Sequence, residues 1–171
     1  MPRHTARFLA PIFFAALLAW SLPAQARVFS PDGEGFSVNM PGKPKTSKET
    51  HKSFVGAVHE TSYTVSSGGV TYTASVSELP GAAVALGGTG TILSKARDGL
   101  LKDAGGTETA FNNITIGGKE GRQLLYDTAS GSGQAKLTLN DKKLYIVVAA
   151  GPKAATAAIT RFVNSFQLTS P

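Results

Sequence analysis

The clearest pattern in the chain is an alternation of apolar and polar residues between positions 117 and 149. In the segment 134–139, Ala135, Leu137 and Leu139 alternate with polar residues, which predicts a strand with one buried and one wet face. In the segment 143–149, both alternating sets are apolar. A strand of this kind is typical of the centre of a sheet that is covered on both faces. Together with residues 117–126, these segments predict three consecutive antiparallel strands.

A helix is predicted to close this region, over residues 152–166. Pro152 suits the first turn of a helix, where its missing N–H costs no hydrogen bond. Apolar residues then recur at helical spacing and share one face: Ala155, Ile159, Phe162, Val163 and Phe166. This helix covers only one face of the sheet, so a two-sided central strand requires a second layer on the other face.

The rest of the chain adds strands and one more helix. Alternation predicts strands at residues 36–40, 55–65, 70–76 and 107–116. A helix is expected from Thr89 or Thr91 to Ala104, after a glycine- and alanine-rich loop from Pro80 to Gly90. The order of these elements indicates an α+β fold, with one antiparallel sheet flanked by helices on its faces.

The first 26 residues have the pattern of a secretory signal peptide. Arg3 and Arg7 precede an apolar stretch, Phe8–Trp20, and the small-x-small triplet Ala24-Gln25-Ala26 follows. The stretch is 13 residues long, whereas a transmembrane helix needs about 20, which argues against a membrane anchor. We expect cleavage after Ala26, a single domain over residues 27–171, a periplasmic or secreted location and no transmembrane segment after cleavage.

Composition excludes several chemistries. The chain has no cysteine, so disulfides, thiol catalysis and cysteine-bound metals are ruled out. Without the predicted signal peptide, 15 basic residues face 11 acidic ones, a net charge of +4. This charge is far below that of a typical nucleic-acid binder, and export argues against such a partner as well. No cofactor motif is present, and we expect no cofactor.

His51 and His59 are candidate metal ligands. In a continuous strand, Glu49, His51 and His59 would share a face, with Glu60 close in sequence. At about 3.3 Å per residue, His51 and His59 would then lie about 26 Å apart, too far to bind one ion unless the chain bends. We therefore expect solvent-facing residues and no metal site.

Catalytic and anion-binding motifs are weak. No Gly-x-Ser-x-Gly stands between a strand and a helix, and Gly131-Ser132-Gly133 fits a hairpin turn. The run from Gly87 to Thr91 resembles an anion-binding helix start, but it lacks the lysine and the spacing of a phosphate-binding loop. A flexible loop with a capping threonine is the preferred interpretation.

The most basic part of the chain after residue 26 is a candidate binding segment. Lys43, Lys45, Lys48 and Lys52 lie in a polar stretch that we expect to be an exposed, mobile loop or edge segment. One hypothesis is that the four lysines dock an acidic partner, either an anionic lipid headgroup of the envelope or an acidic protein face. The alternative is a solvated segment whose lysines keep an edge strand from pairing with other chains.

Three stretches resemble the PsbP/DcrB-like family. These are the opening from Ser30-Pro31 to Lys43-Pro44, the pair Gly121-Arg122, and the ending from Arg161-Phe162 to Ser165-Phe166. The resemblance implies an α/β/α sandwich around a central antiparallel sheet. Family members include a photosystem extrinsic subunit, a nuclear-import factor that binds a small GTPase, and bacterial envelope proteins. The resemblance implies binding to larger partners and no shared catalytic residues.

These observations favour a non-enzymatic exported protein that binds a macromolecular partner or an envelope component. One alternative is a small-ligand carrier with a pocket between sheet and helix, and a second is an unrecognised hydrolase. An exposed apolar patch would favour the first function and a deep lined pocket the second. A pocket with convergent titratable groups would favour the third.

Overall fold

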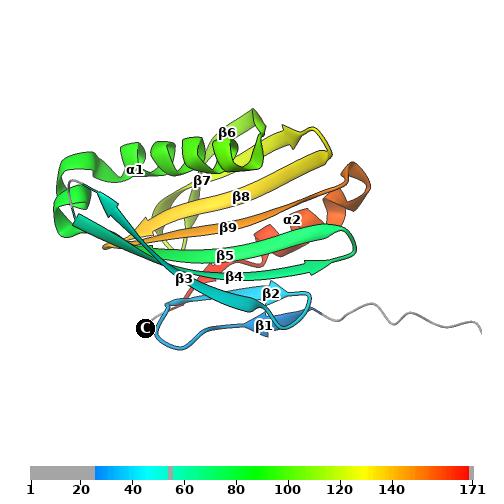
Figure 1. The fold of residues 1–171 in the computed structure, drawn as a ribbon, viewed down its shortest axis with the longest axis horizontal. Helices are drawn as coiled ribbons and strands as arrows, with labels where there is room; N and C mark the ends of the chain where they lie inside the picture. Colours follow the sequence, from blue (N-terminus) through cyan, green and yellow to red (C-terminus); the bar gives the residue numbers. More distant parts are fainter. Residues whose placement is uncertain (1–25, 54–55, 170–171) are drawn as a thin grey trace, which may run out of the picture.

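A computed structural model describes residues 26–53 and 56–169. The chain folds into two antiparallel sheets and two α-helices, an α+β arrangement as predicted (Figure 1). Apart from Ala26, the predicted signal peptide lies outside the described residues, so the cleavage site stays a prediction. None of the described helices combines the length and the apolar character needed to cross a membrane.

The large sheet holds seven strands in the order β3-β4-β5-β9-β8-β7-β6. Their bounds are β3 (Lys45–Ser53), β4 (Gly56–Ser67), β5 (Val70–Glu78), β6 (Thr107–Ile116), β7 (Lys119–Thr128), β8 (Gly131–Asn140) and β9 (Lys143–Gly151). All neighbours pair antiparallel. β9 lies between β5 and β8, which confirms the predicted central position of the last strand of the meander.

A second, smaller sheet corrects the expectation of a single one. It has the order β1-β2-β10, formed by β1 (Arg27–Phe29), β2 (Phe36–Met40) and β10 (Gln167–Leu168). The strand predicted at 36–40 is confirmed, but its neighbours come from both ends of the described chain. With three and two residues, β1 and β10 are too short to show a periodic pattern.

The closing helix and the small sheet together cover one face of the large sheet. A short 3₁₀ turn (Lys153–Ala155) leads into α2 (Thr156–Asn164), and its Ile159, Phe162 and Val163 are buried as predicted. These side chains join Phe36 of β2 and Val147 of β9 in one apolar core. This core covers the central strands on that face, whereas Lys48 and Lys52 of β3 and His59 of β4 are exposed on the same face.

The other face is covered by α1 (Gly81–Ala104), which packs against β7 and β8. Its Leu93 is fully buried with Leu124 and Leu137. The helix begins well before the predicted start, so the segment from Pro80 to Gly90 is not a loop. The alanine-rich residues 82–85 favour helix, and only Gly88, at φ 65°, breaks the helical backbone.

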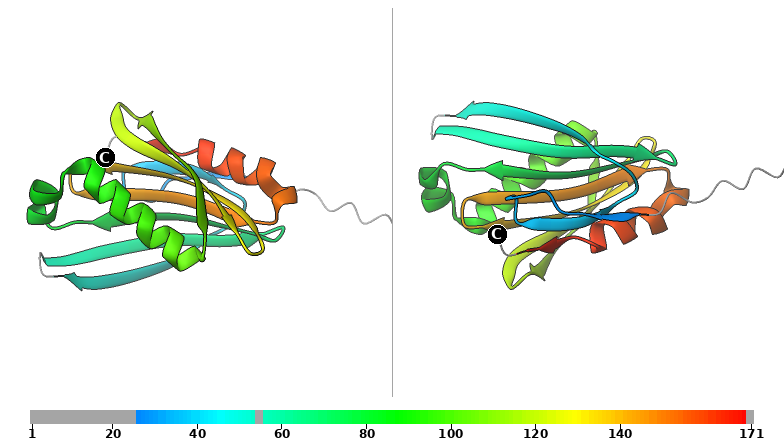
Figure 2. Two further views of the ribbon diagram at one scale, coloured as in Figure 1. Left: turned by 90° about the horizontal axis from the view of Figure 1, so that it is seen from above. Right: turned by 90° about the horizontal axis from the view of Figure 1, so that it is seen from below.

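This second layer covers only part of the sheet. Seen from above, α1 crosses one side of the large sheet, and the hairpin of β3 and β4 projects beyond it (Figure 2). In β9, Val147 faces the α2 side and is 1% exposed, whereas Ile146 and Val148 face α1 and are only half-buried. The prediction that both faces of this strand are covered therefore holds for Val147 but not for Ile146, because α1 lies over β7 and β8 and leaves part of β9 open.

Candidate functional site

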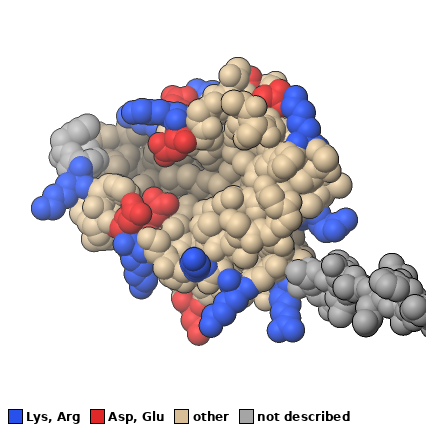
Figure 3. All heavy atoms as spheres, turned by 45° about the vertical axis from the view of Figure 1, so that its right-hand side comes forward, with Lys and Arg blue, Asp and Glu red and all other residues tan. Residues whose placement is uncertain are grey.

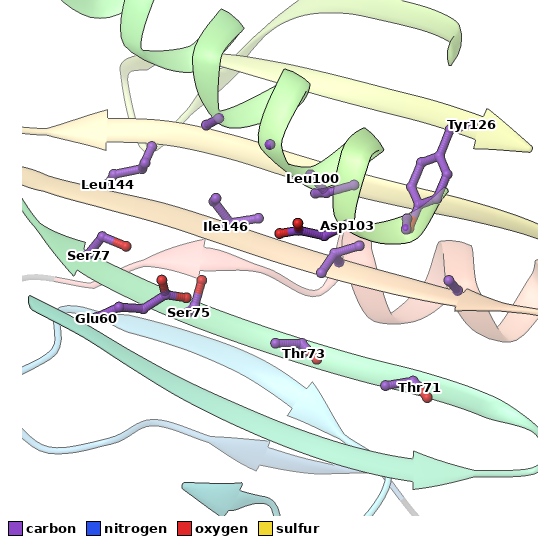
Figure 4. Close-up of a pocket in the computed structure, with 15 residues that line it drawn as sticks. Glu60, Thr71, Thr73, Ser75, Ser77, Leu100, Asp103, Tyr126, Leu144 and Ile146 are labelled. Atoms are coloured by element: carbon purple, nitrogen blue, oxygen red, sulfur yellow. The ribbon is translucent and has the colours of Figure 1, made fainter. Parts of the chain in front are cut away.

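The incomplete cover by α1 leaves a groove between this helix and the sheet. The cavity has a volume of about 600 Å³ and is lined by residues of β4, β5, β9 and α1, with Tyr126 of β7 at its edge (Figure 4). Pockets that bind small molecules typically measure about 300–1,000 Å³. We call this cavity the α1 groove.

Apolar side chains form one side of the α1 groove. Ile146 and Val148 reach it from β9, and Leu100 reaches it from α1. The two β9 residues belong to the apolar set that sequence analysis assigned to a buried face. Their partial exposure means that a ligand with an apolar part would remove them from water.

A row of hydroxyl groups runs along β5 beside this apolar strip. Thr71, Thr73, Ser75 and Ser77 alternate with the core residues of the strand and so point to the α1 side (Figure 4). Ser75 is 7% exposed and Ser77 is 6% exposed. Neither hydroxyl has a hydrogen-bond partner among the described residues. Since no fully buried side-chain oxygen of the described residues lacks a partner, these two hydroxyl oxygens reach the open space of the groove, where a bound molecule can pair with them.

The charged groups of the groove are carboxylates. Glu60 of β4 lies directly opposite Ser77 in the strand register, and Asp103 comes from the last turn of α1. No Lys, Arg or His among the described residues lines the groove. The molecular surface is hollowed here, with acidic side chains on both sides of the hollow (Figure 3). The groove is therefore locally acidic on a chain whose net charge is positive.

Tyr126 closes one end of the groove. Burial raises the pKa of its phenol above the ordinary value of 10. Its ring packs closely on Gly133, where an added Cβ would come within 2.1 Å of the ring. The phenol therefore stays protonated at neutral pH and is not a general base there.

The histidines lie differently from the expected continuous strand. Ser53 pairs with Gly56, so the chain reverses and odd-numbered residues of β3 face even-numbered residues of β4. His51 Nε2 lies 3.5 Å from Glu49 Oε2 and 3.9 Å from Glu60 Oε2. His59 is on the opposite face, with Nδ1 3.1 Å from Thr50 Oγ1. The shared face predicted for Glu49, His51 and His59 is thus wrong, because the hairpin changes the phase.

The described residues do not form an arrangement that fits a metal site or a serine nucleophile with its base. No group of three or more His, Cys, Asp or Glu side chains there is placed to hold a metal ion. A serine nucleophile needs a base within hydrogen-bond reach. Strand β4, with Glu60, separates Ser77 from His51, and neither groove serine is bonded to a histidine.

The four candidate lysines are exposed but do not form one surface. Lys43 precedes β3, while Lys45, Lys48 and Lys52 belong to this edge strand. The expected mobile loop is therefore a strand paired along its whole length with β4, and the interpretation as an edge segment is confirmed. By strand alternation, Lys45 faces the α1 side and Lys48 and Lys52 face the other side.

Sequence analysis named Glu60 only beside the candidate histidines and did not predict a groove. The signal was present in part, because the polar half of the alternation in β5 is made entirely of Thr and Ser. Glu60 and Asp103 lie 43 positions apart in the sequence. No local pattern indicates that these two carboxylates line one cavity.

Comparison with known proteins identifies the fold. No family model and no curated protein sequence matches the chain. The solution structure of cyanobacterial PsbP (CyanoP) from Synechocystis sp. PCC 6803 is similar, with a TM-score of 0.57 and 14% sequence identity. The match covers 85% of this chain and 93% of that one. Two unequal antiparallel sheets, a helix on each face of the large sheet and this structural match together show that the chain has a PsbP-like fold.

Proposed function

We propose that this chain is an exported, non-enzymatic protein that binds a ligand in the α1 groove. The observation that carries the proposal is the pair Ser75 and Ser77, two mostly buried residues whose hydroxyls reach the cavity and have no hydrogen-bond partner in the described chain. A bound molecule that enters the groove can hydrogen-bond both hydroxyls in place of water. The signal-peptide pattern of residues 1–26 supports the exported location.

The shape of the described surface supports a ligand more than a large apolar partner interface. The large apolar residues with high exposure are Val28 and Leu86, which lie on different elements. A contiguous apolar patch, which would favour macromolecular docking, is not formed by such single residues. The α1 groove instead combines volume, an apolar side and a few placed polar groups, as ligand sites do.

Gly99 provides a test of this function. It lines the groove from α1, and an added Cβ there would meet no atom within 4 Å. Gly99→Leu should fill part of the cavity, while the helix gains up to about 0.8 kcal/mol in propensity. Compounds found by a thermal-shift screen of the parent should then bind the variant at least about tenfold more weakly, a loss of about 1.4 kcal/mol.

Gly90→Leu is the matched control on the same helix. An added Cβ there contacts only the ends of the Arg122 and Glu120 side chains, at 3.9 Å and 4.0 Å, away from the groove. Isothermal titration of both variants should show parental affinity for Gly90→Leu only. Two results would contradict the proposal. The first is a ligand that binds Gly99→Leu as tightly as it binds the parent. The second is a screen of anionic, neutral and cationic compounds in which none binds the parent.

A further inference from the structure

The polar groups of the α1 groove accept hydrogen bonds more readily than they donate them. The ionised carboxylates of Glu60 and Asp103 only accept, and each serine hydroxyl offers two lone pairs. No side-chain ammonium, guanidinium or imidazole among the described residues lines the cavity. An anionic ligand would meet two negative charges and no cation, whereas a cationic ligand would meet only complementary charge.

This acidity is local and does not reflect the overall charge. The whole chain carries 17 Lys and Arg against 11 Asp and Glu. Asp103 has no ion pair among the described residues, and Glu60 has only His51, which belongs to β3 and does not line the groove. Asp103 is therefore open to a positive charge supplied from outside the described chain, and Glu60 keeps its Oε1 for one, because its contact with His51 is made by Oε2 at 3.9 Å.

The groove is elongated along β5. From Thr71 to Ser77 the strand spans roughly 20 Å at about 3.3 Å per residue. Glu60, Ser75 and Ser77 gather toward one end of this line (Figure 4). The apolar side chains of Ile146 and Val148 follow the same direction on β9, opposite Ser75 and Thr73. This arrangement matches a molecule with a charged head and an apolar chain.

We propose that the α1 groove selects an organic cation, an ammonium group carried on an apolar chain. The ammonium group lies among Glu60, Ser75 and Ser77, to which its three N–H groups donate, and Asp103 adds negative potential from α1. The chain lies along Ile146 and Val148. This inference rests on the proposed function, because it names the ligand class for the same site.

Three probes that share one chain and differ in charge test the inference. Decylammonium, 1-decanol and decanoate are titrated into the purified protein by calorimetry, the two ions below their micelle concentrations and 1-decanol below its solubility limit. We expect decylammonium to bind at least about tenfold more tightly than 1-decanol, a difference of about 1.4 kcal/mol, and decanoate to bind most weakly. Gly99→Leu should weaken all binding that occurs in the groove.

Carboxylate variants assign the selectivity to named side chains. Glu60→Gln should weaken decylammonium binding about tenfold, Asp103→Asn less, and neither should change the affinity for 1-decanol. Asp98→Asn is the matched control, because Asp98 is an exposed carboxylate of the same helix that pairs with Arg97 outside the groove. Melting temperatures should match the parent for all three variants.

The outcomes separate this inference from the proposed function. If 1-decanol or decanoate binds as tightly as decylammonium and Gly99→Leu abolishes that binding, the groove is a ligand site but the cation preference is wrong. Decylammonium binding that is unchanged in Glu60→Gln and Asp103→Asn would overturn it as well. If no probe and no compound of the wider screen binds, both proposals fall.

Discussion

At the scale of single residues, burial decides which side chains resist ionisation. The pKa of Tyr126 is raised by burial alone, and burial is also the main cause for Tyr63, Tyr72 and Tyr145. Glu34 adds to the effect at Tyr63 and Tyr145 through its negative charge. All four shifts act in the same direction, so folding favours the protonated phenols.

Tyr126→Phe tests this coupling between folding and pH. A phenol whose pKa is raised on folding stabilises the protein below the unfolded value of about 10, and this contribution is lost as the pH rises through the folded pKa. The variant has no proton to lose at this position. Urea unfolding at pH 8 and pH 11 should therefore show a smaller loss of free energy for Tyr126→Phe than for the parent. Equal losses in both proteins would show that Tyr126 is not the responsible group.

At the scale of elements, β3 is an edge strand whose lysines project to both faces of the sheet. A flat partner would meet Lys45 on one face or Lys48 and Lys52 on the other, unless it approached along the strand edge. Exposed lysines on an edge also discourage pairing with other chains. Docking of an acidic surface and protection of the edge thus remain two hypotheses for the same residues.

Replacement of Lys43, Lys45, Lys48 and Lys52 by glutamine distinguishes the two hypotheses. If the lysines dock an anionic surface, co-sedimentation with phosphatidylglycerol vesicles should weaken at least about tenfold, since each lysine near such a surface contributes about 1 kcal/mol. Binding by the parent should also fall steeply with added salt. The melting temperature should change little, because these side chains are exposed.

The matched control changes four exposed lysines elsewhere, with the same change in net charge: Lys95, Lys102, Lys119 and Lys153. If vesicle binding falls equally in both variants, the net charge of the protein, and not the position of the β3 lysines, accounts for the binding. If vesicle binding is unchanged but light scattering shows self-association of the β3 variant, the lysines protect the edge and do not dock a partner.

At the scale of the whole molecule, the two faces of the large sheet are covered unequally. On one face, α2 and the small sheet cover β9 and the neighbouring central strands, whereas on the other face α1 leaves part of β9 open. Neighbouring residues of one strand consequently have different environments. Val147 is buried in the sealed core, and Val148 lines the α1 groove.

Val147→Asp and Val148→Asp measure this difference directly. The first variant places a carboxylate in an apolar core without a partner, which should cost about 3 kcal/mol or more. The second places it at a half-open groove and should cost about 1 kcal/mol. For a chain of this size, these costs correspond to melting-temperature losses of about 6–12 °C and about 2–4 °C. Equal losses for the two variants would contradict the unequal cover.

Much of the fold follows from local patterns in the chain. The apolar and polar alternation predicted β2, β5, β6 and the meander of β7, β8 and β9, and helical spacing predicted the buried face of α2. The first turns of α1 were missed because glycines at 87, 88 and 90 obscured an alanine-rich helix. The strand β10 was missed because two residues carry no period.

The candidate site depends on information that is not local. Alternation along β5 determined that Thr71, Thr73, Ser75 and Ser77 share one face, since side-chain direction in a strand is set by the covalent backbone. Only the tertiary structure decided that α1 lies over β7 and β8, so that this face borders a cavity. The pairing of Ser53 with Gly56 likewise placed Glu60 on the groove side and His59 on the other. Packing between distant segments brought Glu60 and Asp103 to one groove, because such contacts depend on how whole elements fit together.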